Sequence, residues 1–292
     1  MVKMTTLKVA TTQMRCSWDV QANVDKAKNL IRQAADCGAK IILLQELFER
    51  KYFPQQQKPA YMDFATELEN DVAVTELQKL AKELHVVLPV SFFEKKNTNR
   101  YNSLTVIDAT GDILGVYRKS HIPDDVGYEE KYYFTPGNTG FKVWQTAYGK
   151  IGVGICWDQW FPEAARCMAL EGAEFILYPS AIGSVPQHPE INSKGHWQRT
   201  IQGHAAANLV PIIVANRVGT EIIDDSEITF YGSAFITDQT GRIVEQADEK
   251  SESVLVHSFD TDQIKATRNA WGLFRDRRPD LYRPILTLDG QG

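Results

Sequence analysis

Two patterns of apolar residues alternate along this chain. Short, almost wholly apolar runs are typical of strands buried on both faces, and apolar residues every three or four positions are typical of amphipathic helices. The runs predict strands at residues 7–14, 40–46, 86–94, 103–119 (two strands around a turn), 141–156 (a hairpin), 174–181, 211–217 and 233–246 (a hairpin). The periodic segments predict helices within residues 23–39, 69–85, 162–173 and 195–209, the first of them ending at Gly38.

Helices and strands therefore alternate, which predicts an α/β fold. Two internal echoes add detail: "CGAKIILLQE" with "EGAEFILYPS", and "VIDATGDIL" with "FITDQTGRIV". Either the same turn chemistry is reused by chance, or the fold has two similar halves. In the second case, helices outside two sheets give a four-layer α-β-β-α sandwich. Linkers and low-complexity segments are absent from the sequence, so we expect a single domain over residues 1–292.

Composition excludes several classes of protein. The chain has 292 residues, 43% hydrophobic and 24% charged, with a net charge of −5 and no long basic run, which argues against a nucleic-acid partner. An apolar stretch near the roughly 20 residues that span a bilayer is missing, and so is a signal-peptide core at the start, so we expect no membrane partner and a cytoplasmic location. The four cysteines lack C-x-x-C spacing, which argues against a disulfide scaffold or a zinc site.

Candidate chemistry begins at "KIGVGICWDQWFPE", residues 150–163, where a predicted strand ends at Cys156. A sharp turn from a strand into a helix exposes a nucleophile and frees nearby backbone N–H groups for an oxyanion. The alternative is a buried cysteine that serves only packing.

Two other predicted strands end in charged residues. Glu46 ends "IILLQE" and Lys119 ends "ILGVYRK". Taken singly, each can be an ordinary solvated side chain. Together with Cys156 they supply a base, a cation and a thiol at strand ends, where α/β sheets build their sites.

These segments resemble the nitrilase superfamily of carbon–nitrogen hydrolases. The resemblance is carried by "LLQELFE" around Glu46, "YRKSHIP" around Lys119 and "GVGICWDQWFPEAAR" around Cys156, with "YPSAIG" and "QGHAAANLVPIIVANRVG" further on. It implies the α-β-β-α sandwich and a Glu46–Lys119–Cys156 triad that works without a metal or cofactor. It also implies a further glutamate, Glu130, with Glu129 as the alternative.

The resemblance implies a mechanism as well. Lys119 favours the thiolate of Cys156, and Glu46 takes the thiol proton as general base. The Lys119 ammonium and the Trp157 backbone N–H meet the developing oxyanion. Glu46 then passes its proton to departing ammonia, and water cleaves the thiol-acyl intermediate.

The finer match concerns the substrate. "ELFERKYFPQQ" and "KSHIPDDVGYEEKYYFTPGNTGFKVW" are most similar to the subgroup that hydrolyses N-carbamoylputrescine to putrescine, carbon dioxide and ammonia. We therefore expect a small cationic ureido substrate. The candidates for its binding are acidic, aromatic or part of a matched segment: Tyr52, Asp124 or Asp125, Trp157, Trp160, Ala181 and Glu190, with Glu190 favoured for the distal ammonium.

Two other functions remain open from the sequence. A β-ureidopropionase-like enzyme or ω-amidase would act on another small amide, and a substrate carboxylate would require an arginine such as Arg166 or Arg199. A binding module without activity would not need the triad. The tail at residues 268–292 is rich in arginine and aromatic residues, which suits an interface, so we expect a homo-oligomer built from dimers.

Overall fold

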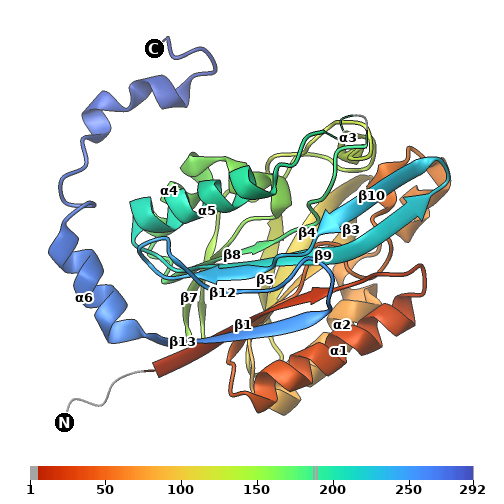
Figure 1. The fold of residues 1–292 in the computed structure, drawn as a ribbon, viewed down its shortest axis with the longest axis horizontal. Coiled ribbons are helices and arrows are strands. Elements are labelled where there is room, and N and C mark those ends of the chain that lie inside the picture. Colours follow the sequence, from red (N-terminus) through yellow and green to blue (C-terminus); the bar gives the residue numbers. More distant parts are fainter. Residues whose placement is uncertain (1–5, 187, 189, 292) are drawn as a thin grey trace.

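The computed structural model describes residues 6–186, 188 and 190–291 (Figure 1). The strands in chain order are β1 (Thr6–Met14), β2 (Ile41–Leu43), β3 (Leu88–Lys96), β4 (Asn99–Ile107), β5 (Ile113–Arg118), β6 (Val143–Thr146), β7 (Gly149–Val153), β8 (Phe175–Pro179), β9 (Ile212–Ile223), β10 (Ser226–Tyr231), β11 (Phe235–Thr237), β12 (Ile243–Gln246) and β13 (Ser253–Asp260). The helices are α1 (Val20–Asp36), α2 (Val72–Leu84), the one-turn α3 (Glu130–Tyr133), α4 (Pro162–Leu170), α5 (Lys194–Asn208) and α6 (Thr261–Trp271).

The elements form four layers, as expected. Helices α1 and α2 cover one side of the strands, and α4 and α5 cover the opposite side (Figure 1). Three apolar clusters fill the spaces between layers. One lies between α1, α2 and strands β1 to β3, a second joins residues of β1, β2, β4 and β5 to residues of β7, β8 and β9, and a third lies under α4 and α5. The chain therefore has the α-β-β-α sandwich that the sequence predicted.

Parallel pairing brings several strand ends to one region. β1 pairs in parallel with β2, and β7, β8 and β9 pair in parallel in that order. The two groups touch where the end of β1 reaches β9, with Gln13 opposite Asn216. Because the carboxyl ends of parallel strands meet at one edge, residues that follow β2 and β7 come close together.

The sequence anticipated most, but not all, of these elements. The predicted helices and hairpins are present, and Gly38 follows α1 with a φ of +89°, a conformation that glycine adopts without strain. β10, β13 and α6 had not been predicted. β10 alternates buried and exposed residues, and β13 is mostly half-buried, so neither has the continuous apolar run that marked the other strands.

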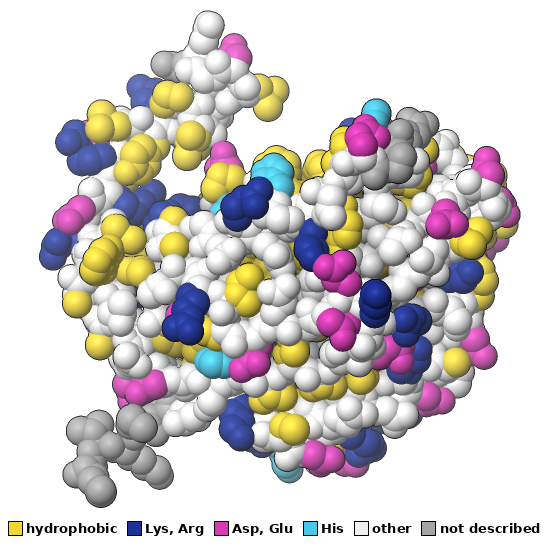
Figure 2. All heavy atoms as spheres, in the orientation of Figure 1, with side chains coloured by type: hydrophobic (Ala, Val, Ile, Leu, Met, Phe, Trp, Pro, Cys, Tyr) yellow, Lys and Arg dark blue, Asp and Glu magenta, His cyan; other side chains and the backbone are white. Residues whose placement is uncertain are grey.

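The end of the chain leaves the body of the fold. Beyond α6, residues 272–291 run as an arm away from the sheets (Figure 1). Figure 2 shows hydrophobic side chains gathered along this arm, and the most exposed of them are Leu281, Ile285, Leu286 and Leu288. Trp271, at the end of α6, is exposed as well. Among the described residues, no helix is both long enough and apolar enough to cross a membrane.

Candidate active site

Cys156 lies at a strained turn. It follows β7 by three residues and opens a short 3-10 helix, η4 (Cys156–Trp160). Its φ is +43°, in the left-handed region that non-glycine residues seldom adopt. Such strain is common where a side chain must project from a sheet edge into a site.

Glu46 occupies a similar turn on the neighbouring layer. It follows β2 by three residues, and the next residue, Leu47, has a φ of +48°. The amide of Asn102, on β4, donates a hydrogen bond of 2.7 Å to Glu46 Oε1. The second oxygen, Oε2, is buried and has no hydrogen-bond partner among the described residues. That free oxygen is the atom available to take a proton.

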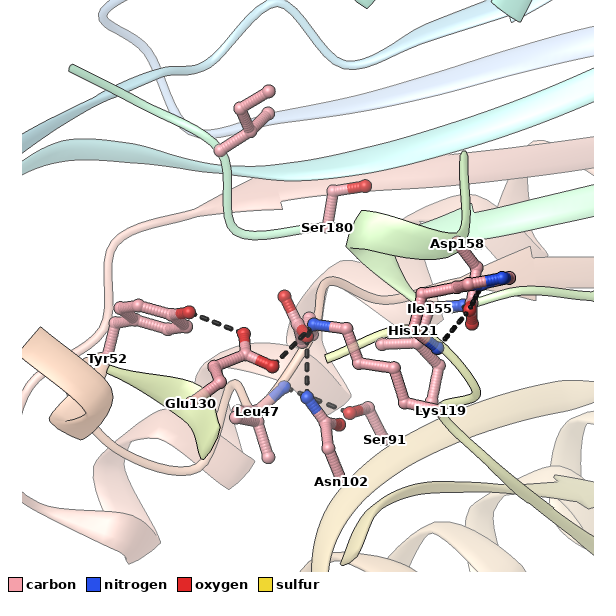
Figure 3. A network of polar contacts seen from close by, with 12 residues as sticks. Leu47, Tyr52, Ser91, Asn102, Lys119, His121, Glu130, Ile155, Asp158 and Ser180 are labelled. Carbon is pink, nitrogen blue, oxygen red and sulfur yellow. Dashed lines mark hydrogen bonds and ion pairs between the residues drawn. The ribbon is translucent and has the colours of Figure 1, made fainter. Parts of the chain in front are cut away.

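Lys119 connects two carboxylates. It follows β5 directly, and its Nζ lies 2.9 Å from Glu46 Oε1 and 2.7 Å from Glu130 Oε2 (Figure 3). All three side chains are fully buried. Glu130 comes from the one-turn helix α3, and its Oε1 accepts a 2.5 Å hydrogen bond from the Tyr52 hydroxyl. The alternative, Glu129, instead accepts a hydrogen bond from the Gln57 amide, so the structure brings Glu130 to the lysine.

Burial sets the protonation states of this group. It raises the pKa of Glu130 to about 7, against the opposing charge of Lys119. It acts to lower the pKa of Lys119, but Glu130 and Glu46 outweigh it and raise that pKa, so the ammonium persists. The Lys119–Glu130 contact is therefore a cation beside a carboxyl group that titrates near neutrality.

Two opposing effects set the protonation of Cys156. Burial and the charge of Glu46 raise the pKa of Cys156 well above its usual value. Lys119 and a hydrogen bond from the Ala181 backbone lower it, as predicted for the lysine, but they are weaker than burial. Cys156 therefore rests as a thiol and requires a base at the moment of attack.

A cavity of about 410 Å³ opens onto Cys156. Cys156 and Glu130 lie in its wall, with aromatic and small apolar side chains around them. The described residues that line it are Tyr52, Pro123, Asp124, Asp125, Tyr128, Glu130, Cys156, Trp157, Trp160, Ala181, Ile182, Gly183, Val185, Ser193 and His196. Lysine and arginine are absent from this set.

The structure brings most of the predicted substrate residues together. Asp124, Trp157, Trp160 and Ala181 line the cavity, and Trp157 is 41% exposed at its rim. Tyr52 also lines it, but its fully buried hydroxyl holds Glu130, which adds an orienting role to the expected cation–π contact.

Glu190 does not join the other predicted substrate residues. Its side chain is 69% exposed, pairs with His188 at 3.3 Å, and lies outside the cavity lining. The choice of Glu190 for the ammonium is therefore not supported by the geometry. The sequence alone does not distinguish a loop carboxylate that faces solvent from one that lines a cavity.

Two groups around the triad were missed by sequence reasoning. Asn102 holds Glu46 from β4, and nothing in its sequence context marks it. Asp158, two residues after Cys156, is fully buried and accepts hydrogen bonds from the backbone N–H groups of Ile155 and His121 and from the His121 ring (Figure 3). It also accepts a hydrogen bond from the Tyr117 hydroxyl. An aspartate so close to the nucleophile was a visible signal. Among the described residues, no three His, Cys, Asp or Glu side chains gather as metal ligands would.

Comparison with known proteins identifies the family. The model of the carbon–nitrogen hydrolase family matches residues 8–269. This chain belongs to the carbon–nitrogen hydrolase family. It is an enzyme of that family, and the segments around Glu46, Lys119 and Cys156 lie within the matched range.

Three relatives extend the comparison. The chain is 57% identical to an N-carbamoylputrescine amidase of Arabidopsis thaliana over 97% of this chain and 96% of that protein. It is 52% identical to a citrullinase of Francisella tularensis subsp. tularensis over 97% and 99% of the two chains. The crystal structure of a carbon–nitrogen hydrolase from Helicobacter pylori G27 has a TM-score of 0.90 at 37% identity, covering 97% of this chain and 99% of that one.

Proposed function

We propose that this carbon–nitrogen hydrolase cleaves N-carbamoylputrescine to putrescine, carbon dioxide and ammonia and serves putrescine synthesis. The observation that carries the proposal is the cavity on Cys156, which has acidic and aromatic walls and no arginine or lysine among its described lining residues. Such a lining suits a slim alkyl chain that ends in an ammonium group. The amidase relative at 57% identity supports the same substrate.

The chemistry starts with a proton transfer. Glu46 Oε2, which has no partner among the described residues, takes the proton of the Cys156 thiol. The sulfur then attacks the ureido carbon, and the oxyanion is met by the Lys119 ammonium and the Trp157 backbone N–H. The N–H groups at the start of a helix have no acceptor within that helix, so the Trp157 N–H is available.

Two bond cleavages complete the reaction. Glu46 returns its proton to the terminal nitrogen, ammonia leaves, and the carbamoyl group stays on sulfur as a thiocarbamate. Water, deprotonated by Glu46, attacks that carbon and releases the thiol and an N-alkyl carbamic acid. The carbamic acid then loses carbon dioxide to give the diamine. In this scheme Glu130, held by Tyr52, orients Lys119.

The distal ammonium is placed at Asp124 and Asp125 in this proposal. Both are exposed carboxylates that line the outer part of the cavity, whereas Glu190 faces solvent. An ammonium there would be attracted by two negative charges and by the faces of Trp157 and Trp160.

Citrulline is the second candidate, because a citrullinase is 52% identical to this chain. Citrulline presents the same ureido chain but adds a carboxylate beside the amine. A carboxylate requires a cationic partner, and His196 is the one basic side chain among the described lining residues. Arg166 lines a separate groove with the tail, and Arg199 is not part of the cavity lining. The same reasoning disfavours β-ureidopropionate.

Ammonia release tests the assignment. N-carbamoylputrescine, citrulline, β-ureidopropionate and a simple aliphatic amide are compared by kcat/KM, and we expect N-carbamoylputrescine to be preferred at least tenfold.

N-butylurea is the matched probe for the ammonium site, because it keeps the ureido group and four carbons but lacks the ammonium. Asp124→Asn with Asp125→Asn should raise KM for N-carbamoylputrescine and leave N-butylurea unchanged, with Glu190→Gln as the silent control. Preference for citrulline would overturn the substrate and keep the triad.

Assembly is the remaining part of the proposal. We infer a homo-oligomer built from dimers, because the arm of residues 272–291 exposes apolar side chains beside a groove lined by α4, α5 and the tail residues Arg277, Tyr282 and Ile285. Analytical ultracentrifugation of the whole chain tests it, with Leu286→Asp expected to weaken association. The cytoplasmic location stays a prediction from the sequence.

A further inference from the structure

One buried cation takes no part in the chemistry above. Arg217 lies on β9, and its side chain is fully buried. Burying a guanidinium is costly unless its donors and its charge are matched, so its partners show what it does. Both Nη atoms of Arg217 are hydrogen-bonded, whereas its Nε has no hydrogen-bond partner among the described residues.

The guanidinium of Arg217 binds the turn that carries Glu46. Its Nη2 donates to the backbone carbonyls of Glu46, at 3.1 Å, and Leu47. Its Nη1 donates to the carbonyl of Arg50 at 2.9 Å. Three carbonyls of one turn, about 170 residues away in sequence, therefore converge on one side chain.

Glu221 adds a contact to a further residue of this turn, Tyr52. One carboxylate oxygen pairs with Arg217 Nη1 at 2.8 Å, and the other accepts the backbone N–H of Tyr52 at 2.6 Å. Glu221 is itself only 3% exposed. The pair thus contacts the backbone at both ends of the segment 46–52.

Both ends of this segment contribute side chains to the cluster of Glu46, Lys119 and Glu130. Glu46 begins it, and Tyr52, which ends it, donates to Glu130. Within the segment, Leu47 is held in a left-handed conformation that a free turn of this sequence would leave. A fixed backbone in this segment therefore sets both the direction of Glu46 Oε2 and the position of the Tyr52 hydroxyl.

We propose that Arg217 and Glu221 are positioning residues: together they clamp the segment 46–52 so that Glu46 and Tyr52 stay aligned with Lys119 and Glu130. The inference rests on the proposed roles of Glu46 and Glu130. It does not depend on which ureido compound is the substrate.

Arg217→Lys and Glu221→Gln test the clamp. A lysine cannot serve three carbonyls and a carboxylate at once, and a glutamine presents an N–H to either Tyr52 or Arg217. Because a displacement of about 1 Å at a reacting group costs about 100-fold in rate, we expect kcat to fall 10- to 100-fold with KM changed less than threefold. The matched control is Arg268→Lys, since Arg268 also donates to two backbone carbonyls, of Ala169 and Ala173, away from the cavity.

Alkylation of Cys156 separates positioning from mere stability. Iodoacetamide labelling of the Cys156 peptide, read by mass spectrometry across pH, should be about tenfold slower at neutral pH in both clamp variants. The difference should shrink as pH rises and solvent hydroxide replaces Glu46 as base. A variant that was only loosened or partly unfolded would instead label faster.

Thermal unfolding is recorded for every variant before these measurements. If Arg217→Lys does not fold, Glu221→Gln, which keeps the arginine and the side-chain volume, carries the test. Wild-type kcat and wild-type labelling in a folded clamp variant would overturn the clamp. Failure of the wild-type enzyme to hydrolyse N-carbamoylputrescine would overturn the proposed function alone, because the labelling comparison needs no substrate.

Discussion

Two turns in this protein each present one residue of the candidate site at the end of a strand, but different contacts hold them in place. The base turn, residues 44–52, follows β2 and carries Glu46; the nucleophile turn, residues 154–160, follows β7 and carries Cys156. Each contains a non-glycine residue in the left-handed region, Leu47 in one and Cys156 in the other. The base turn is held by Arg217 and Glu221 from β9, whereas in the nucleophile turn Asp158 binds the turn's own Ile155 and also Tyr117 and His121.

This difference shows where each turn is vulnerable. Asp158 lies two residues from the nucleophile and binds the backbone N–H of Ile155 directly, so the nucleophile turn carries much of its own support in sequence. The base turn depends on partners that only the assembled sandwich supplies. We therefore expect the nucleophile turn to respond to local changes, and the base turn to respond to changes in protonation and in distant side chains.

Removal of the nucleophile should have the largest effect. Cys156→Ala should lower turnover of N-carbamoylputrescine by about 10⁴-fold or more with unchanged thermal unfolding, because none of the other described cysteines, Cys16, Cys37 and Cys167, lines the cavity. Ammonia release is the assay. Cys167→Ala, an exposed cysteine on α4, is the control and should keep wild-type activity. Near-full activity in Cys156→Ala would contradict the proposed mechanism.

Loss of the local support should rank second. In the wild type, the donors around Asp158 share its two carboxylate oxygens. Asp158→Asn replaces one of these acceptors with an N–H donor that faces other donors. We therefore expect the stability to fall by about 3 kcal/mol and kcat to fall about 100-fold. Urea unfolding and steady-state kinetics measure the two effects. Tyr117→Phe removes only one of the donors and should cost about 1 kcal/mol. Equal effects of the two variants would show that Asp158 does not organise the turn.

At the base turn, Tyr52→Phe should move a titration. The Tyr52 hydroxyl stabilises the ionised form of Glu130, whose pKa lies at about 7, so its loss should raise that pKa. If ionised Glu130 is needed to orient Lys119, the acidic limb of the kcat profile moves to higher pH, and kcat at neutral pH falls about tenfold. A pH profile with the wild-type acidic limb would refute this role of Tyr52.

The smallest effect on turnover should come from Glu49, also on the base turn. Burial and the charge of Asp71 raise the pKa of Glu49 to about 8, and the nearest cation, Arg50, lies 3.8 Å away. The unfolded chain loses this proton near its usual pKa while the folded protein keeps it, so the free energy of unfolding falls as pH rises toward 8. Glu49→Gln should remove this slope and raise the melting temperature at pH 9 relative to wild type. The exposed Glu69→Gln is the control, and identical slopes in all three proteins would exclude Glu49 as the cause.

What the sequence determined by itself was most of the elements and the candidate residues for the chemistry. Continuous apolar runs placed β2 and β8, and the residues at or just beyond predicted strand ends pointed to Glu46, Lys119 and Cys156. This works because a buried strand has a local signature, and because parallel strands deliver their carboxyl ends to one edge. Long motifs around the three residues added Glu130, which the structure places on Lys119.

Tertiary structure decided everything that depends on two segments meeting. Asn102, Arg217 and Glu221 act on Glu46 and Tyr52 only because β4 and β9 pass beside the base turn. Burial raises the pKa of Cys156 more than Lys119 lowers it, and that burial is set by the whole sandwich. The candidate for binding the ammonium changed from Glu190 to Asp124 and Asp125 for the same reason. The sequence gives the charge of a carboxylate, but packing of the layers decides whether that carboxylate lines the cavity.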